Sequence, residues 1–290
     1  MYNLRKHEVW ASEVAEYLNS TLVGEDFLLP GPSSIRTPRS LAKARPGPEG
    51  DLLLLTDGKA TGQARAHIQV RNPELNLARV LREFFASAPV HSIHPTALVD
   101  PEAKIGRNVQ IGAHTVVGPH VEIGDNTVVL QNVTLNGPAT IGRHCVIKDG
   151  AVIGSEGYGF VEDEDGTPFH APQLGRIVIG DRVWVGSNST IERAMVDDTV
   201  IRDDVKIDDL VHVGNGSVIG AKSMLTAGVV IAYDTVIGEG VVIAPNAVVR
   251  ERVVIADNVI VGQGAVVVKD IREAGVYAGN PATLLKARKP

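Results

Sequence analysis

The chain has 290 residues, with 28 Lys plus Arg, 34 Asp plus Glu and a single cysteine. The mildly acidic balance argues against a general electrostatic grip on nucleic acid, and one cysteine excludes an intrachain disulfide framework. The start of the chain is polar, and no 18-residue uncharged apolar stretch follows. We therefore expect a cytoplasmic protein with neither a signal peptide nor a membrane span.

Residues 1–92 predict a small α/β domain. Residues 10–22 have helical spacing, residues 51–55 read as an apolar strand, and residues 75–85 have the pattern of an amphipathic helix. Residues 88–90 are expected to join this domain to the remainder of the chain.

From Ile93 to Val266 an aliphatic residue recurs at every sixth position, in 25 hexads. Residues 159–178 and four extra residues, 197–200, interrupt this register. The fifth position of each hexad is small or apolar, and Cys145 occupies one of these positions. A coiled coil has a period of seven and an amphipathic helix a period of 3.6, so a period of six indicates short strands that each end at a bend.

Three hexads make one triangular coil of 18 residues, and successive coils lie about 4.8 Å apart. The fold class that we predict is mainly β, a parallel β-helix over residues 93–272 that stacks its coils as a solenoid. A short tail, residues 273–290, follows the last coil.

Hexads that are three apart stack on one face, so their outward polar residues form a column. The column expected on one face consists of Asn215, Tyr233, Asp234, Glu251 and Arg252, with Glu192 and Arg193 below them. If the insertion 159–178 replaces no hexad, it leaves from this face and walls a cleft. The alternative is an ordinary solvated surface, because outward positions of any β-helix are polar.

Several segments of the chain resemble one family. They are the N-terminal module, the hexads, residues 154–160 (Gly-Ser-Glu-Gly-Tyr-Gly-Phe), residues 172–175 (Pro-Gln-Leu-Gly) and residues 191–200. Together they are similar to the UDP-3-O-acylglucosamine N-acyltransferases of lipid A biosynthesis. The resemblance implies a left-handed β-helix, a homotrimer with active sites between adjacent prisms, and an N-terminal domain that holds uracil. It also implies transfer of a hydroxyacyl chain from acyl carrier protein to the 2-amino group of a UDP-sugar.

The chain departs from this family at several functional positions. Asn215 stands where the family has its catalytic histidine, and Arg252 stands at the position of a second active-site histidine. Asp208 matches the family pattern. Leu54 and Ala60 replace the aromatic residues that stack on uracil in the family. The ending, residues 276–282, instead resembles acetyltransferases of the hexapeptide class that use CoA.

Amine acylation needs a neutral amine, a held thioester, and groups that receive the proton and the oxyanion. Asn215 cannot take a proton at pH 7, so we expect it to orient the amine or the carbonyl. His212, at the corner before this face, is a candidate substitute base, and Asp208 is a candidate to steer an ammonium group. A solvated corner residue and a turn residue are their respective alternatives. The further predicted contacts to substrate or acyl donor are Asp209, Tyr233, Arg252, Tyr158, His170, Gly279 and Asn280.

The leading interpretation is an N-acyltransferase that moves an acyl group from acyl-CoA or acyl-ACP to the amino group of a nucleotide-linked amino sugar. No bound cofactor, metal or nucleic acid is expected. One alternative is a catalytically silent, trimeric sugar-nucleotide-binding homologue, favoured by the missing histidine. The other is a metal-dependent trimeric lyase, suggested by His114, His120 and His144, although no two of these are one coil apart.

Overall fold

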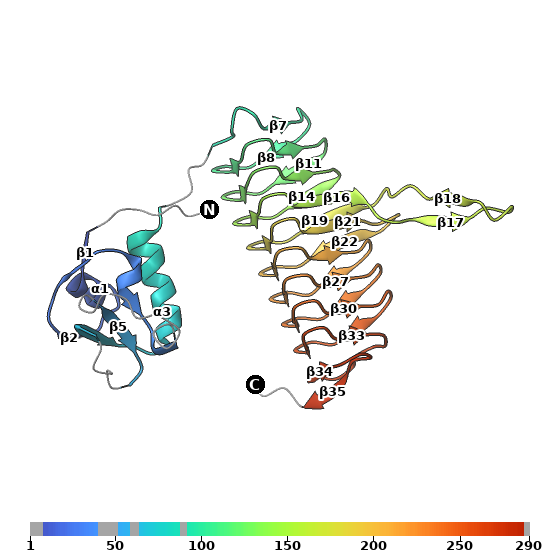
Figure 1. The fold of residues 1–290 in the computed structure, drawn as a ribbon. Coiled ribbons are helices and arrows are strands. Elements are labelled where there is room, and N and C mark those ends of the chain that lie inside the picture. Colours follow the sequence, from blue (N-terminus) through green and yellow to red (C-terminus); the bar gives the residue numbers. More distant parts are fainter. Residues whose placement is uncertain (1–7, 40–51, 59–63, 88–91, 287–290) are drawn as a thin grey trace. The chain divides into compact units, whose positions relative to one another are not determined.

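The computed structural model describes residues 8–39, 52–58, 64–87 and 92–286. The chain divides into two compact units, Met1–Pro89 and Val90–Pro290 (Figure 1). Among the described residues, no helix is long and apolar enough to cross a membrane.

The N-terminal unit is a small α/β fold. Its elements are β1 (Val9–Trp10), α1 (Ala11–Tyr17), β2 (Leu22–Gly24), β3 (Leu28–Leu29), the 3-10 turn η1 (Pro32–Ser34), β4 (Ile35–Arg36), β5 (Leu53–Thr56), β6 (Ala66–Gln69), α3 (Pro73–Val80) and the π-helical turn η2 (Leu81–Phe85). One sheet has the order β2-β6-β5-β4, with β4, β5 and β6 parallel, and β1 pairs with β3.

The first predicted helix is shorter than expected. It ends at Tyr17, because Asn19 adopts a left-handed conformation (φ 47°), and Leu22 already belongs to a strand that pairs with β6. The second predicted helix is present as α3 continued by η2. Asp51 and the joining residues 88–90 lie outside the described residues.

The second unit is a parallel β-helix whose strands form three long sheets (Figure 1). The first sheet contains β7 (Leu98–Val99), β10 (Val116–Val117), β13 (Thr134–Leu135), β16 (Val152–Glu156), β21 (Thr190–Arg193), β24 (His212–Val213), β27 (Val230–Ile231), β30 (Val248–Val249) and β33 (Val266–Val267). The second contains β8 (Lys104–Ile105), β11 (Val121–Ile123), β14 (Ala139–Ile141), β19 (Arg176–Ile179), β22 (Asp198–Ile201), β25 (Val218–Ile219), β28 (Val236–Ile237) and β31 (Val254–Ile255). The third contains β9 (Gln110–Ile111), β12 (Val128–Val129), β15 (Val146–Ile147), β20 (Trp184–Val185), β23 (Lys206–Ile207), β26 (Met224–Leu225), β29 (Val242–Ile243), β32 (Ile260–Val261), β34 (Val276–Ala278) and β35 (Thr283–Lys286).

The interior of the prism is filled by the two inward positions of each hexad, as the repeat predicted. Val213, Ile231 and Val249 stack in the first sheet and are fully buried, and Cys145 is buried at a fifth position. Each fully buried Ile or Val side chain contributes about 1.5–3 kcal/mol. Polar side chains at inward positions are satisfied by the neighbouring coil: Thr115 Oγ1, for example, donates to the Leu130 carbonyl at 2.6 Å.

The corners of the regular coils depend on left-handed backbone at the fourth hexad position. His114, His120 and His144 occupy such positions, with φ of 57–58°. Histidine is among the residues that tolerate this conformation best, so these three side chains are turn residues. Within the described part of the chain, no group of three or more His, Cys, Asp or Glu could hold a metal ion.

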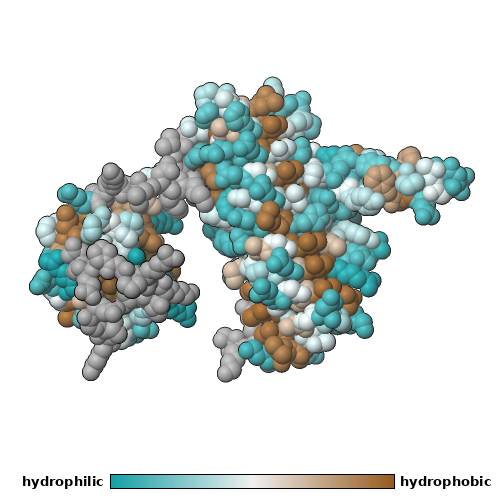
Figure 2. Space-filling model, viewed as in Figure 1, coloured by the Kyte–Doolittle hydropathy of each residue, from teal (hydrophilic) through white to brown (hydrophobic). Residues whose placement is uncertain are grey.

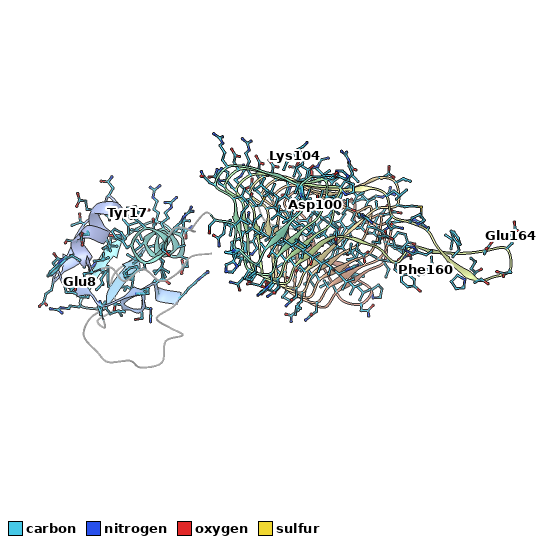
Figure 3. The ribbon with its side chains drawn as sticks, turned by 90° about the horizontal axis from the view of Figure 1, so that it is seen from above. Glu8, Tyr17, Asp100, Lys104, Phe160 and Glu164 are labelled. Atoms are coloured by element: carbon cyan, nitrogen blue, oxygen red, sulfur yellow. The ribbon has the colours of Figure 1, made fainter. Side chains whose placement is uncertain are left out.

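Residues 159–178 contain a β-hairpin, β17 (Phe160–Glu162) and β18 (Pro168–His170), where the sequence predicted only a loop. The hairpin extends away from the prism, with Phe160 near its base and Glu164 at its far end (Figure 3). The outer faces of the C-terminal coils carry apolar side chains between polar corners (Figure 2). Met224, Val236 and Val254 are exposed on them.

Candidate active site

The candidate site lies at the corner where the chain passes from the first sheet to the second. The hairpin leaves here, between β16 and β19, and it replaces no strand, since β16 still pairs with β13 and β21. The four extra residues leave at the same corner one coil on, at 194–197 between β21 and β22, rather than at 197–200 as predicted, because residues 198–200 belong to β22. The two insertions are joined by a hydrogen bond from Leu174 N to Met195 O (2.8 Å).

His212 lies within β24 on the outer face of the first sheet, not at a corner as the sequence suggested, because each strand begins one residue before its hexad. It pairs in register with Thr190 of β21. Its Nδ1 atom is 2.8 Å from Thr190 Oγ1, and its Nε2 atom is 3.8 Å from Glu192 Oε2. The imidazole is therefore held by one hydrogen bond and faces one carboxylate.

Glu192 is largely buried, with 19% of its side chain exposed. Burial raises the pKa of its carboxyl, although the charge of His212 and the backbone N–H of Asn215 oppose that rise. The backbone at the start of the hairpin closes over this group. A Cβ atom added at Gly157 would lie 2.8 Å from Asn215 Oδ1 and 2.9 Å from Glu192 Oε2.

Asn215 follows β24 at the same corner, half-buried. Its Nδ2 atom donates to Gln173 Oε1 at 3.4 Å, a long hydrogen bond. Gln173, at the end of the hairpin segment, is fully buried and donates to Ala171 O at 3.0 Å. The insertion therefore helps to orient the Asn215 amide.

The column predicted above Asn215 is present in the structure. Asp234 N donates to Asn215 O, and Arg252 N donates to Tyr233 O, one coil further on. The Arg252 guanidinium lies 5.2 Å from the centre of the Tyr233 ring and 3.7 Å from Asp234 Oδ2. Arg252 thus has partners within the column.

Asp208 and Asp209 lie at the other end of β24, at the corner between the third and first sheets. Asp209 accepts from Lys148 Nζ at 2.6 Å and from Ser187 N at 2.7 Å, and the Lys148 hydrogen bond is the main cause that lowers the pKa of its carboxyl. The exposed Asp208 accepts from Ser189 Oγ through its backbone carbonyl. The structure does not bring these two side chains to Asn215.

Tyr158 and His170 belong to the hairpin. Tyr158 is almost fully exposed and lies against Phe160, which in turn contacts the His170 ring at 5.2 Å. His170 Nε2 is 3.4 Å from Glu156 Oε2, and the same carboxylate binds Arg193 at 2.7 Å beside a cavity of about 330 Å³. Both predicted residues therefore lie at the corner between the first and second sheets, but their ring contacts and the His170 ion pair involve residues other than His212, Glu192 and Asn215.

Gly279 and Asn280 lie at the C-terminal end of the first sheet. Val266 N donates to Gly279 O at 3.0 Å, and Val266 is three strands beyond His212 on the same face. At the spacing of parallel strands, this separation is about 14 Å.

In the N-terminal unit, Leu54 is buried within β5 and offers no surface for a base to stack on. Ala60 lies outside the described residues. A cavity of about 420 Å³ lies between the end of α1 and α3, lined in part by Arg71 and Arg79.

Sequence reasoning placed Glu192 below the column but missed Thr190, Gly157 and Gln173. Thr190 is 22 residues from His212 rather than 18, because the four extra residues fall between them. Gln173 is 42 residues from Asn215 and reaches it only through the path of the insertion. The sequence feature that could have pointed to Gln173 and Gly157 is their position close to the two ends of the inserted segment.

Models of bacterial transferase hexapeptide repeats match residues 102–137, 120–155 and 234–269, and a model of the hexapeptide repeat of succinyl-transferase matches residues 176–208. The UDP-3-O-acylglucosamine N-acyltransferase of Coxiella burnetii is 35% identical over 221 residues, which is 69% of this chain and 65% of that protein. The chain contains hexapeptide repeats of the bacterial transferase kind and is similar to the UDP-3-O-acylglucosamine N-acyltransferases.

A second relative of that name, from Francisella tularensis subsp. holarctica, is 39% identical over 178 residues, 54% of this chain and 51% of that protein. Among solved structures, the UDP-N-acetylglucosamine O-acyltransferase of Moraxella catarrhalis aligns with a TM-score of 0.61 and 28% identity over 66% of this chain and 73% of that chain. The β-helix is therefore the left-handed β-helix of the hexapeptide-repeat proteins. The chain spans just under two thirds of the length of the Coxiella relative.

Proposed function

We propose that the protein is an N-acyltransferase that moves an acyl group from an acyl thioester to the amino group of a nucleotide-linked amino sugar. The observation that carries this proposal is the cluster of His212, Glu192 and Asn215 at a corner of a fold whose relatives are named as N-acyltransferases of UDP-3-O-acylglucosamine. The relatives' names favour a UDP-linked glucosamine as acceptor, and the resemblance found in the sequence supports lipid A biosynthesis in the cytoplasm as the setting.

His212 is the base in this proposal. If Thr190 Oγ1 accepts a hydrogen bond from Nδ1–H, the lone pair of Nε2 is free to take the proton of the attacking amine. Asn215, oriented by Gln173, then holds the amine or the thioester carbonyl. The amine nitrogen bonds to the carbonyl carbon, the carbon–sulfur bond breaks, and the proton passes from the imidazolium to the thiolate.

The outer face of the first sheet offers a path for the acyl donor. Beyond His212 it carries Val230, Val248 and Val266, and it ends at Gly279 and Asn280. A strip of aliphatic side chains suits the pantetheine arm shared by acyl-CoA and acyl-ACP. Both remain donors to be tested, and the open face gains a second wall if the protein is a homotrimer.

The test is thiol release by the purified full-length protein incubated with UDP-linked amino sugars and a panel of acyl-CoA and acyl-carrier-protein donors. We expect release that depends on both substrates, and a mass increase of the sugar nucleotide equal to the acyl group. Failure across the whole panel would contradict the proposal. A monomer mass by light scattering would contradict the trimer.

A second candidate is a silent homologue that binds a sugar nucleotide. The observation that favours it is Asn215 and Arg252 at the positions of the two family histidines. Titration calorimetry separates the two: a silent homologue binds the sugar nucleotide with no response to any acyl thioester, whereas the enzyme binds both.

A further inference from the structure

Two side chains of β21 face the two nitrogen atoms of the His212 imidazole. Thr190 Oγ1 is at hydrogen-bond distance from Nδ1 (2.8 Å), which fixes the plane of the ring. Glu192 Oε2 faces Nε2 at 3.8 Å. Both come from β21, one coil below, so the backbone ladder between β21 and β24 sets their positions.

The 3.8 Å separation between Glu192 Oε2 and His212 Nε2 has a different effect on the neutral ring and on the protonated ring. It is too long for a hydrogen bond, so Glu192 does not occupy the lone pair of a neutral Nε2 atom. It is short enough for an ion pair once Nε2 carries a proton. Because only 19% of the Glu192 side chain is exposed, solvent screens this attraction only in part.

Other charged groups around the ring, within the described part of the chain, are engaged elsewhere. Arg193 donates to Gly137 O and to Glu156 Oε1. Asp234 faces Arg252, and Asp209, at the far end of β24, pairs with Lys148. Glu192 is therefore the charged group that the structure aims at His212.

We infer that Glu192 is a positioning residue for the transfer reaction. It stabilises the imidazolium that forms when His212 takes the proton of the attacking amine at Nε2, while Thr190 keeps the ring in place. The role of Glu192 in catalysis rests on the proposed acyl transfer, whereas its pairing with the protonated His212 ring does not. The carboxylate itself takes no proton: the imidazolium returns its proton to the thiolate, and Glu192 ends the cycle in the state in which it began.

The test is Glu192→Gln, a replacement of nearly the same shape. Without the carboxylate the protonated ring is less favourable, so His212 loses its proton at lower pH. We expect the acidic limb of the kcat/KM profile for thiol release to move to lower pH, and the plateau rate to fall about tenfold. Glu122→Gln on β11, whose carboxylate pairs with Lys104, is the matched control and should leave both unchanged.

A second measurement does not depend on turnover. The NMR titration midpoint of the His212 ring should move to lower pH in Glu192→Gln, by the same amount as the kinetic limb, and should not move in Glu122→Gln. Equal midpoints in Glu192→Gln and the unmodified protein would overturn the inference. If the unmodified protein releases no thiol but the midpoint shifts, the reaction proposal fails while the Glu192–His212 pairing stands.

Discussion

The corner at Asn215, next to His212, and the regular coils beyond it are built from the same repeat but differ in what their side chains do. In the coils from β25 to β33, each corner is a short turn closed by one left-handed residue and by backbone bonds to the next coil, such as Asn258 N to Glu239 O (2.8 Å). In the two coils below Asn215, insertions replace that closure at the same corner, whereas the turn at Asn215 keeps it, with Gly216 left-handed (φ 70°) and Asp234 N donating to Asn215 O. Groups from three distant segments, Gln173, Glu192 and Asn215, meet at this corner.

The difference shows where a repeat protein can hold chemistry. A regular coil satisfies its backbone by hydrogen bonds to the neighbouring coils and fills its interior with aliphatic side chains, so it contributes stability more than binding groups. A site needs an interruption that brings in groups from outside the repeat. The comparison predicts that changes in the regular coils alter stability, and that changes at the corner alter activity.

The largest effect is expected from a cavity in a regular coil. Ile231→Ala removes a fully buried side chain from the first sheet and should lower the free energy of unfolding by about 2–5 kcal/mol. Urea denaturation followed by circular dichroism measures this. A loss below about 1 kcal/mol would mean that the stack relaxes around the gap and that the regular coils are less tightly packed than they look.

His212→Gln should lower kcat by about 10²- to 10⁴-fold, because the general base is removed. The free energy of unfolding should change little, since the side chain lies on the outer face. The assay is thiol release at saturating substrates, with circular dichroism as the check on folding. Unchanged turnover in His212→Gln would show that His212 is not the general base.

Gly157→Ala tests the backbone that closes over the cluster. The added methyl group would meet Asn215 Oδ1 and Glu192 Oε2 at less than 3.0 Å, so those side chains must move. We expect kcat/KM to fall about tenfold, since small displacements of positioning groups cost that much or more. Gly58→Ala, where a Cβ meets nothing within 4 Å, is the control and should be silent.

The smallest effect is expected for Asp209→Asn at the opposite corner. The native pKa of this carboxyl is lowered, chiefly by Lys148, so its stabilising contribution is present above the ordinary carboxyl range and is lost as pH falls through the native value. Near pH 7 the variant should lose under about 1 kcal/mol, because the carboxylate is partly exposed. Thermal melts from pH 2 to pH 7 should show the difference shrinking in acid, with the exposed Asp208→Asn as the comparison.

The prism was predictable from sequence because one rule governs it. Aliphatic residues at every sixth position fix the strands, the inward faces and the stacking of coils, so the spacing alone placed Val213 under Ile231. Residue chemistry and family resemblance also selected Asn215 and His212. In the N-terminal unit, which has no repeat, the first helix was predicted too long because Asn19 stops it.

The contacts within the site were not predictable in the same way. A hexad count gives neighbours one coil away, but Thr190 reaches His212 only because the four extra residues extend the interval to 22. Gln173 and Gly157 depend on how the insertion folds back, and a local pattern contains no information on that path. Distances such as the 3.8 Å between His212 and Glu192 follow from rotamers set by these contacts.

The hairpin departs from the prism with only a local irregularity, a register shift between Ile153 and Ser155 where β16 pairs with β21. The strands on either side, β14 and β19, still pair directly, as do β15 and β20, although the inserted segment leaves the stack between them. The length of the segment inserted at this corner therefore does not determine whether β14 pairs with β19 or β15 with β20. Such a chain can exchange, shorten or lengthen the arm beside its reactive groups while the ladders of the second and third sheets stay in register, which makes the corner the natural place to graft a new substrate preference.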